Sequence, residues 1–230
     1  MSIIEIKGLH KVYDAETALP VRAVNGITLN IDTGEFTAVV GPSGSGKTTL
    51  LNIMGGLDHP SEGEVWIDGV KINELSSGQR TDFRMKNIGF VFQAYNLIPV
   101  FTAKENVEFI MHLQGIPKHQ REQRTHELLT AVGLGERMDS RPNKLSGGQQ
   151  QRVAVARALA SKPKFILADE PTANLDSAST DNLLNIMEKL NRDEHITFIF
   201  STHDQRVVNK ARRVITIQDG VVVSDIRKTE

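Results

Sequence analysis

Hydrophobic residues follow three patterns along this chain, and each pattern predicts a different kind of element. Residues 27–31 alternate apolar and polar side chains, as a half-buried strand does. Helical spacing, with apolar residues three and four positions apart, follows in residues 48–57 and 177–192. Short, mainly apolar runs, the pattern of strands buried on both faces, occupy residues 36–40, 165–168 and 196–200. Strands that alternate with helices predict an α/β fold built on a mostly parallel sheet.

Each of the two predicted helices has one apolar face, which we expect to lie in the core. In the later helix, this face consists of Leu183, Ile186, Met187 and Leu190. In the earlier helix, it consists of Leu50, Ile53, Met54 and Leu57. Gly55 and Gly56 predict that the earlier helix ends close to them.

Other segments predict additions to this parallel core. Residues 64–69 predict a strand that runs into a turn, and with it an antiparallel sheet in the N-terminal part. Asp219 and Gly220 separate two apolar stretches and are typical of a hairpin turn. Residues 94–160 are expected to be rich in helices, with a loop at 139–144. We therefore predict one domain, residues 1–230, with a helical subdomain inserted at 94–160.

The composition excludes several functional classes. The chain has 27 Lys and Arg against 28 Asp and Glu, and only 5% of its residues are aromatic, which argues against a nucleic-acid partner. Because there is no cysteine, disulfides, thiolate metal sites and cysteine nucleophiles are excluded. No apolar run approaches the ~18 residues of a membrane span, and the N-terminus lacks the pattern of a secretion signal. We therefore expect a cytoplasmic protein.

A glycine-rich segment lies between the strand at 36–40 and the helix that follows, and it matches the phosphate-binding pattern G-x-x-x-x-G-K-S/T. Its residues are Gly41, Pro42, Ser43, Gly44, Ser45, Gly46, Lys47 and Thr48. Glycines allow the backbone to approach phosphates closely, and the amides at the helix N-terminus attract anions. We expect Lys47 to reach the β- and γ-phosphates of a nucleotide, and the Thr48 hydroxyl to bind Mg²⁺.

Two acidic residues end the apolar strand at 165–168. In parallel sheets, ligands bind at this end of the strands. Asp169 fits a carboxylate that holds Mg²⁺, and Glu170 fits the group that polarises an attacking water. A strand that ends in two acids is weak evidence alone, but after a phosphate-binding loop it indicates nucleotide hydrolysis.

A second helix N-terminus has the features of an anion site. Ser146 is a good N-cap residue, and Gly147 and Gly148 leave backbone amides accessible at the start of a helix. Taken in isolation, helix capping explains this segment better than ligand binding.

Together, the segment Leu145-Ser146-Gly147-Gly148-Gln149 and the two motifs around it resemble the ATP-binding cassette (ABC) family over essentially the whole chain. The resemblance implies a P-loop NTPase core of the RecA-like type, with an N-terminal antiparallel β subdomain and a helical insertion. It implies an ATPase with ATP and Mg²⁺ as its ligands. It also implies a homodimer formed on ATP binding, in which the partner chain's ATP contacts Ser146, Gly147, Gly148 and Gln149.

The resemblance assigns roles to residues outside the main motifs. Tyr13 takes the position of an aromatic residue that packs against adenine, and Thr49 extends the nucleotide-binding loop. Gln93 matches the glutamine that joins the core to the helical insertion, with roles in catalysis and in binding Mg²⁺. Asp176 lies in the D-loop, which follows the catalytic acid, and His203 matches the histidine that contacts the γ-phosphate.

Local similarities at residues 51–58, 93–99 and 102–107 resemble the LolD/MacB group within this family. This group powers lipoprotein release, export of toxins and peptides, or related work across the inner membrane. The resemblance implies an integral membrane permease subunit as a partner, and a location on the inner face of the cell membrane. It does not name a substrate.

Two other functions remain open at this point. One is a soluble ABC-type ATPase that acts as a regulator without a membrane partner. The other is a P-loop GTPase, which needs an N-K-x-D motif to read the base. The nearest match has Ser146 where the aspartate belongs, which disfavours a GTPase.

An apolar run directly follows Gln93 and includes Tyr95, Leu97, Ile98 and Phe101. It fits two interpretations. The residues are either the insertion's own core, or part of a groove that receives a cytoplasmic helix of the membrane subunit.

Overall fold

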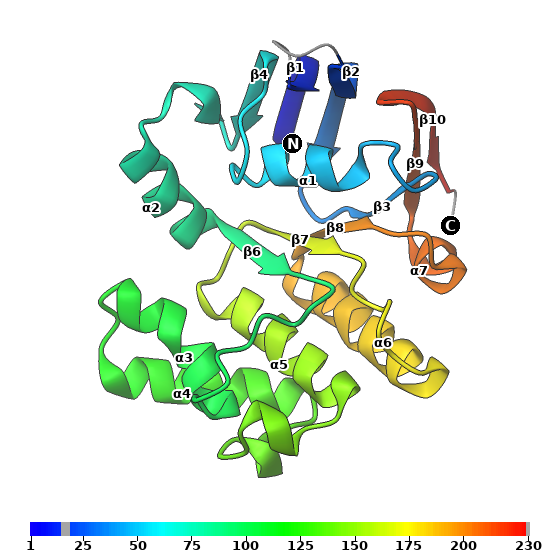
Figure 1. Cartoon of the computed structure of the whole chain (residues 1–230). Helices are drawn as coiled ribbons and strands as arrows, with labels where there is room; N and C mark the ends of the chain where they lie inside the picture. Colours follow the sequence, from blue (N-terminus) through cyan, green and yellow to red (C-terminus); the bar gives the residue numbers. More distant parts are fainter. Residues whose placement is uncertain (15–18, 229–230) are drawn as a thin grey trace.

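The computed structural model describes residues 1–14 and 19–228, and the strands of this part form two sheets (Figure 1). The larger sheet has six strands in the order β10-β9-β3-β8-β7-β6. All neighbouring strands in it are parallel except β9 and β10, which form an antiparallel hairpin. The predicted mostly parallel core and its terminal hairpin are therefore confirmed. The strands are β3 (Phe36–Val40), β6 (Ile88–Val91), β7 (Phe165–Asp169), β8 (Thr197–Ser201), β9 (Arg213–Gln218) and β10 (Val221–Arg227).

The smaller sheet is antiparallel and has four strands in the order β2-β1-β4-β5. It contains the segment that predicted an antiparallel sheet in the N-terminal part, so that expectation is confirmed. Its apolar side chains face the larger sheet and form one core with it. The strands are β1 (Ser2–Tyr13), β2 (Val21–Asp32), β4 (Glu62–Ile67) and β5 (Val70–Lys71).

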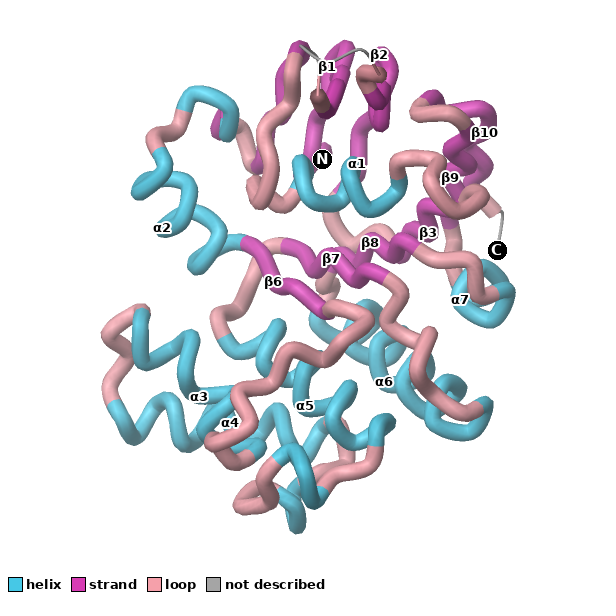
Figure 2. Tube along the Cα trace, in the orientation of Figure 1, coloured by secondary structure: helices cyan, strands magenta, loops and turns pink. Residues whose placement is uncertain are grey.

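Helix α1 (Lys47–Met54) lies between the two sheets (Figures 1 and 2). Leu50, Ile53 and Met54 are fully buried there, as predicted. The helix is shorter than expected, because the chain turns at Gly56, whose φ is +62°. Leu57 lies beyond the helix and is 45% exposed, so its prediction as a buried residue was wrong.

The opposite face of the larger sheet is covered by α5 (Gly147–Ala160) and α6 (Ser177–Glu194) (Figure 2). Two further helices, α3 (Ala103–Leu113) and α4 (Lys118–Ala131), pack on α5 away from the sheet. The segment predicted to be rich in helices therefore contains α3, α4 and α5. Helix α5 is buried on several sides, because it lies between β6, α6 and these two helices.

Several elements did not follow from the hydrophobic pattern. Helix α2 (Ser77–Asn87) has Arg80 as its only buried residue, so it has no buried apolar face that the hydrophobic pattern could indicate. The short helix α7 (Gln205–Lys210) and the 3-10 turns η1 (Ile72–Glu74), η2 (Gly135–Arg137) and η3 (Pro142–Lys144) are also additions. Among the described residues, no helix combines the length and the apolar character that a membrane span needs.

Candidate functional site

The glycine-rich segment forms the loop from β3 to α1, and two of its glycines are required by the backbone. A Cβ on Gly41 would lie 2.0 Å from the carbonyl oxygen of Ile217, and one on Gly46 would lie 2.1 Å from that of Ala23. Both residues also have positive φ, +152° and +101°. Gly46 is the N-cap of α1 and has no side chain to satisfy the first helical amides, which therefore remain available to an anion.

Lys47 is buried inside this loop rather than extended into solvent. Its Nζ atom donates to the carbonyl oxygens of Gly41 and Pro42, each at 2.9 Å. A lysine ammonium has three protons, so the loop uses two and leaves one for another acceptor. The loop itself thus fixes the position of the positive charge next to the amides of α1.

Thr48 and Asp169 meet although they are far apart in the sequence. The Thr48 hydroxyl lies 3.2 Å from both carboxylate oxygens of Asp169. This contact follows from the sheet order, because β3 and β7 both flank β8 and end at the same edge. A hydroxyl and a carboxylate give a set of oxygen donors, which Mg²⁺ prefers.

Among the described residues, no group of three or more His, Cys, Asp and Glu could hold a metal alone. A site of one hydroxyl and one carboxylate fits a metal ion that takes its other ligands from water and from phosphates, as Mg²⁺ does.

Glu170 occupies a strained position directly after β7. Its φ is +46°, which is uncommon for a residue with a side chain, and its amide donates to the carbonyl of Ser201 at 2.8 Å. The carboxylate then points at the end of β8. There, Nδ1 of His203 lies 2.7 Å from Oε1, and the Thr202 hydroxyl lies 3.3 Å from Oε2. The structure therefore brings Glu170 and His203 together as a pair, which the sequence did not predict.

Most of the predicted site residues line one cleft of about 790 Å³. Its walls come from the end of β1, the start of β2, the glycine-rich loop and the ends of β6 and β7. This volume is in the range of small-molecule sites. The predicted residues that line it are Tyr13, Gly41, Pro42, Ser43, Gly44, Gly46, Lys47, Thr48, Thr49, Gln93, Glu170 and His203. Ser45 is buried in the loop behind it.

Tyr13 stands at the rim of this cleft and is held by two residues that the sequence reading missed. Its hydroxyl donates to Asp58 at 2.7 Å, and Nζ of Lys11 lies 4.7 Å from the centre of its ring. Lys11 and Asp58 also form an ion pair at 2.7 Å. Burial, together with the hydrogen bond to Asp58, raises the pKa of the Tyr13 phenol above its ordinary value. Tyr13 is 37% exposed, so part of its surface remains accessible to a ligand.

A family profile described as "ABC transporter" matches residues 24–173, which cover the glycine-rich loop and the Asp169–Glu170 pair. The chain belongs to the ABC transporter family. It is an ATP-binding cassette, and binding of ATP follows from this membership.

Relatives of this cassette fall into two kinds. One is the macrolide export ATP-binding/permease protein MacB of Hyphomonas neptunium, 47% identical over 97% of this chain. The chain spans only 34% of that protein, and a similar third of other MacB proteins. The other kind has a similar length: an uncharacterized ABC transporter ATP-binding protein of Methanocaldococcus jannaschii is 46% identical over 98% of this chain and all of its own.

A solved structure matches the cassette over its full length. The ATP-binding cassette MJ0796, in a dimeric post-hydrolysis state bound to ADP and Pi, superposes with a TM-score of 0.90. It is 42% identical to this chain, and each chain covers 99% of the other. This agreement confirms the predicted fold, including the antiparallel subdomain.

The residues expected to contact the partner chain's ATP, here called the signature residues, are Ser146, Gly147, Gly148 and Gln149, and they do not line the cleft of their own chain. Ser146 caps α5, and its hydroxyl accepts from the amide of Gln149 at 3.3 Å, while the Gln149 side chain accepts from the amide of Ser146 at 2.8 Å. Gly147 and Gly148 are closely packed: a Cβ would lie 2.7 Å from the Tyr95 hydroxyl and 2.7 Å from that of Ser179, respectively. The predicted N-cap is confirmed.

Asp176 is also absent from the cleft lining, and it caps α6. Its carboxylate accepts from the amide of Ser179 at 2.9 Å and from the hydroxyl of Ser179 at 2.7 Å. These hydrogen bonds hold the pKa of Asp176 below its ordinary value. A structural role for Asp176 is therefore visible, alongside the role expected from the family.

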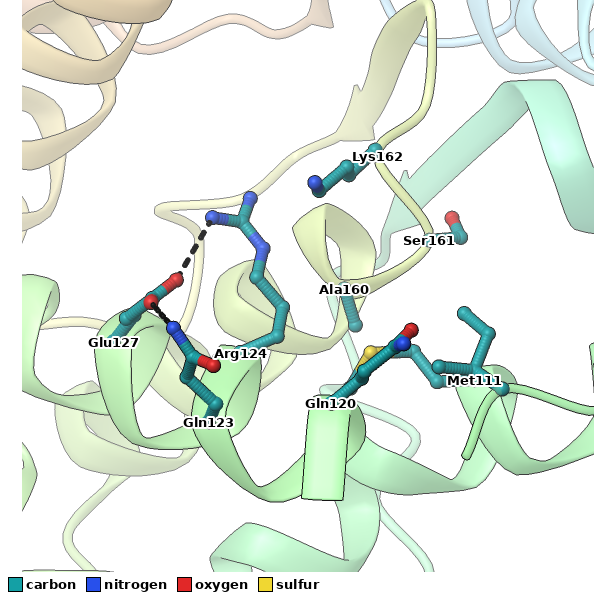
Figure 3. A pocket seen from close by; sticks show the side chains of 9 residues that line it. Met111, Gln120, Gln123, Arg124, Glu127, Ala160, Ser161 and Lys162 are labelled. Carbon is teal, nitrogen blue, oxygen red and sulfur yellow. Dashed lines mark hydrogen bonds and ion pairs between the residues drawn. The ribbon is translucent and has the colours of Figure 1, made fainter. Parts of the chain in front are cut away.

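A second cavity, of about 400 Å³, contains none of the predicted residues (Figure 3). It lies between α4 and the end of α5, over Met111 and Ala160, with Arg124 and Lys162 at its edge (Figure 3). Glu127 already forms an ion pair with Arg124 and accepts a hydrogen bond from Gln123. This second cavity shares no lining residue with the nucleotide cleft and is separate from it.

Proposed function

We propose that this cassette hydrolyses ATP in a dimer of two such chains and thereby drives an integral membrane permease. The observation that carries the proposal is the single cleft that holds the Lys47 ammonium, the Thr48 hydroxyl and the Glu170 carboxylate. In this arrangement, the triphosphate of ATP lies along the loop between Gly41 and Thr49. Lys47 and the amides of α1 neutralise its charge, and Tyr13 packs against the adenine.

Glu170 is the residue that we assign to the attacking water. A carboxylate beside the γ-phosphate orients the water and accepts its proton as the bond to phosphorus forms. Since an ionised carboxylate only accepts hydrogen bonds, Nδ1 of His203 donates to it and orients the imidazole. We assign Nε2, on the other side of this ring, to the γ-phosphate, to which it donates when both ring nitrogens carry a proton. The bond between the γ-phosphorus and the oxygen that bridges to the β-phosphorus breaks, so that ADP leaves with this oxygen and inorganic phosphate is the other product.

Mg²⁺ is the cofactor that the oxygen donors fit. Thr48, Asp169 and the side-chain amide oxygen of Gln93 would hold it. The ion supplies charge neutralisation on the β- and γ-phosphates. Asp169 accepts a hydrogen bond from Thr48, which keeps the two oxygen donors together.

The position of the signature residues supports a dimer. Ser146 and Gly147 begin α5 but do not line their own cleft, so the anion-binding end of α5 has no nucleotide within its chain. We propose that it completes the cleft of the second chain, and that the reverse contact completes the first. Two ATP molecules would then lie between the chains, with Gln149 and Asp176 at the same interface.

Mixing two inactive variants tests the shared site. Lys47→Ala disables the loop of its own chain, and Ser146→Arg blocks the signature end of α5. A mixed dimer has one cleft with both defects and one with neither. We therefore expect each variant alone to be inactive, and an equal mixture to recover about a quarter of the wild-type rate if pairing is random and sites act independently. Phosphate release at constant total protein measures this.

The control for the mixing experiment is the double variant with both substitutions in one chain, mixed with wild type. In a mixed dimer of these two chains, each cleft has one defect, so no intact cleft forms. The resulting fall in activity also tests whether chains exchange. Failure of the Lys47 and Ser146 variants to restore any activity, although the chains exchange, would contradict a composite site.

An apolar groove supports the membrane partner. It has a volume of about 300 Å³ and lies where β6, α3 and α5 meet, with Phe90 and Phe92 stacked at 5.7 Å along it. Phe109 and Leu113 of α3 border it and are 38% and 54% exposed. Relatives named ATP-binding/permease proteins carry both parts in one chain. We propose that a cytoplasmic helix of the permease binds here, which places the cassette on the inner face of the cell membrane.

This groove differs in part from the run that the sequence indicated after Gln93. Leu97 is partly buried against the core cluster of α3, α5 and α6, and it does not line the groove. Val100 is 67% exposed, but it does not line the groove. The groove instead takes its apolar side chains from β6 and α3, which the sequence reading did not single out.

Leu113→Glu tests the groove. A carboxylate in an apolar contact costs desolvation on binding, so we expect co-purification with the permease to fall at least about tenfold. The basal ATPase rate of the isolated cassette should stay within about twofold of wild type, because Leu113 is exposed and remote from the cleft. Pull-down from detergent-solubilised membranes and phosphate release are the two measurements.

Ile226→Glu is the matched control, since Ile226 on β10 is 59% exposed and outside the groove. If neither variant nor wild type retains any membrane protein, the cassette acts as a soluble regulator instead. If Ile226→Glu lowers binding as much as Leu113→Glu, the contact lies elsewhere.

A further inference from the structure

The segment after Gln93 has an unusual backbone. Tyr95 and Asn96 are consecutive residues with positive φ, +44° and +50°, and neither is glycine. Such a conformation is disfavoured for a residue with a side chain, and two in a row require contacts that hold them. The segment is also fixed at its start, where the side-chain amide of Asn174 donates to the carbonyl of Gln93 at 3.0 Å.

Arg157 of α5 supplies those contacts. Its guanidinium donates to the carbonyl of Tyr95 at 2.9 Å and, through its other terminal nitrogen, to the carbonyl of Asn96. Two successive left-handed residues direct both carbonyls toward one planar donor group, which matches the fork of an arginine. Among the described residues, no carboxylate forms an ion pair with Arg157, and burial lowers the pKa of its guanidinium.

Helix α5 holds the segment from its other side as well. The side chain of Gln151 is fully buried and donates to the carbonyl of Phe92 at 3.4 Å and to that of Pro171 at 2.7 Å. The same helix begins at the signature residues, where Gly147 lies against the Tyr95 hydroxyl. One helix therefore carries the signature at its start and, further along, the groups that fix the backbone around Gln93.

We propose that Arg157 is a positioning residue for Gln93, which it couples to the signature end of α5 by holding Tyr95 and Asn96 in their left-handed form. This rests on the proposed ATPase function, in which Gln93 serves the cleft of its own chain and the signature serves the other. A shift of α5 caused by ATP at one site then reaches Gln93 at the second site. The alternative is that Arg157 only donates hydrogen bonds to two loop carbonyls and stabilises the fold.

Hydrogen exchange tests the backbone contact without requiring any ATPase activity. Arg157→Lys replaces the two terminal donor nitrogens of the planar guanidinium, one for each carbonyl, with a single nitrogen on a shorter side chain. We expect amide exchange in residues 94–98 to become about tenfold faster, as for the loss of one charge-assisted hydrogen bond, while exchange in α5 stays unchanged. The control is Arg121→Lys on α4, which removes an arginine contact to the carbonyl of Ile116. Unchanged exchange in residues 94–98 would overturn the proposal.

A double-mutant cycle tests the link to Gln93. We expect Arg157→Lys to lower kcat about tenfold with the Kd for ATP within about twofold, and to have no further effect on kcat in a Gln93→Ala background. Asn96→Gly accepts the left-handed conformation without strain, so adding it to Arg157→Lys should restore at least half of the lost rate. Multiplicative losses in the double variant, or no rescue by Asn96→Gly, would assign Arg157 to stability alone.

The outcomes also separate this inference from the proposed function. A wild-type cassette without ATPase activity would refute the function but leave the exchange experiment valid. An Arg157→Lys protein that fails to fold, while Arg121→Lys folds, would overturn the role of Arg157 in positioning Gln93.

Discussion

Glu170→Gln is expected to abolish turnover while ATP still binds. Glutamine has nearly the same shape as glutamate but cannot accept a proton, so we expect kcat to fall by about a hundredfold to ten-thousandfold, the usual range for a lost general base. The Kd for ATP should change little, because Glu170 lies next to the γ-phosphate position and not against the loop that binds the phosphates. Phosphate release under single-turnover conditions measures the loss.

A second result should accompany this loss. With hydrolysis blocked, ATP remains between the chains, and we expect a dimer in size-exclusion chromatography with ATP, but not with ADP. Glu188→Gln is the matched control, since Glu188 on α6 forms an ion pair with Lys210 of α7 and does not line the cleft. A Glu170→Gln protein that turns over near the wild-type rate would remove Glu170 from the role of base.

Lys47→Ala is expected to act on binding itself. Lys47 is buried within the loop and its charge lies where the phosphates bind, so its removal takes away at least one charge-assisted hydrogen bond. We expect the Kd for ATP to rise about tenfold to a hundredfold, and hydrolysis to fall with it. Isothermal titration calorimetry with ATP, with and without Mg²⁺, measures the affinity.

Loss of Lys47 also removes a hydrogen-bond donor from each of the carbonyls of Gly41 and Pro42, so the thermal unfolding midpoint of this variant must be measured. Lys86→Ala, on the exposed face of α2, removes the same charge elsewhere and should leave the affinity unchanged. An unaltered Kd in a folded Lys47→Ala protein would mean that the loop does not bind the triphosphate.

Local sequence determined the parts of this site that depend on neighbouring residues. The loop from Gly41 to Thr48 needs glycine where the backbone of another strand lies about 2 Å from a Cβ position, and its lysine bonds to the loop itself. Ser146 caps the helix that follows it. Asp169 and Glu170 were predictable as a pair because they directly follow the apolar run that predicts β7, at the end of the strand where ligands bind in parallel sheets.

The hydrophobic pattern was a poorer guide to where helices begin and end, and to helices with few buried side chains. Leu57 fits the helical spacing of α1, yet Gly56 turns the chain first and leaves Leu57 exposed. Helix α2 has almost no buried side chain, so neither periodicity nor hydrophobicity indicated it. In both cases, backbone geometry and capping outweigh the apolar pattern.

Only the tertiary structure decided which distant residues meet. Tyr13 bonds to Asp58, Glu170 bonds to His203, and Arg157 holds the carbonyls of Tyr95 and Asn96. None of these pairs has a helical or strand spacing, because each joins the ends of different elements. The order of the strands in the sheet brings these ends together, and that order results from packing both sheets and their helices into shared cores. The sequence therefore determined the chemistry available at each position, and the fold determined which groups can act together.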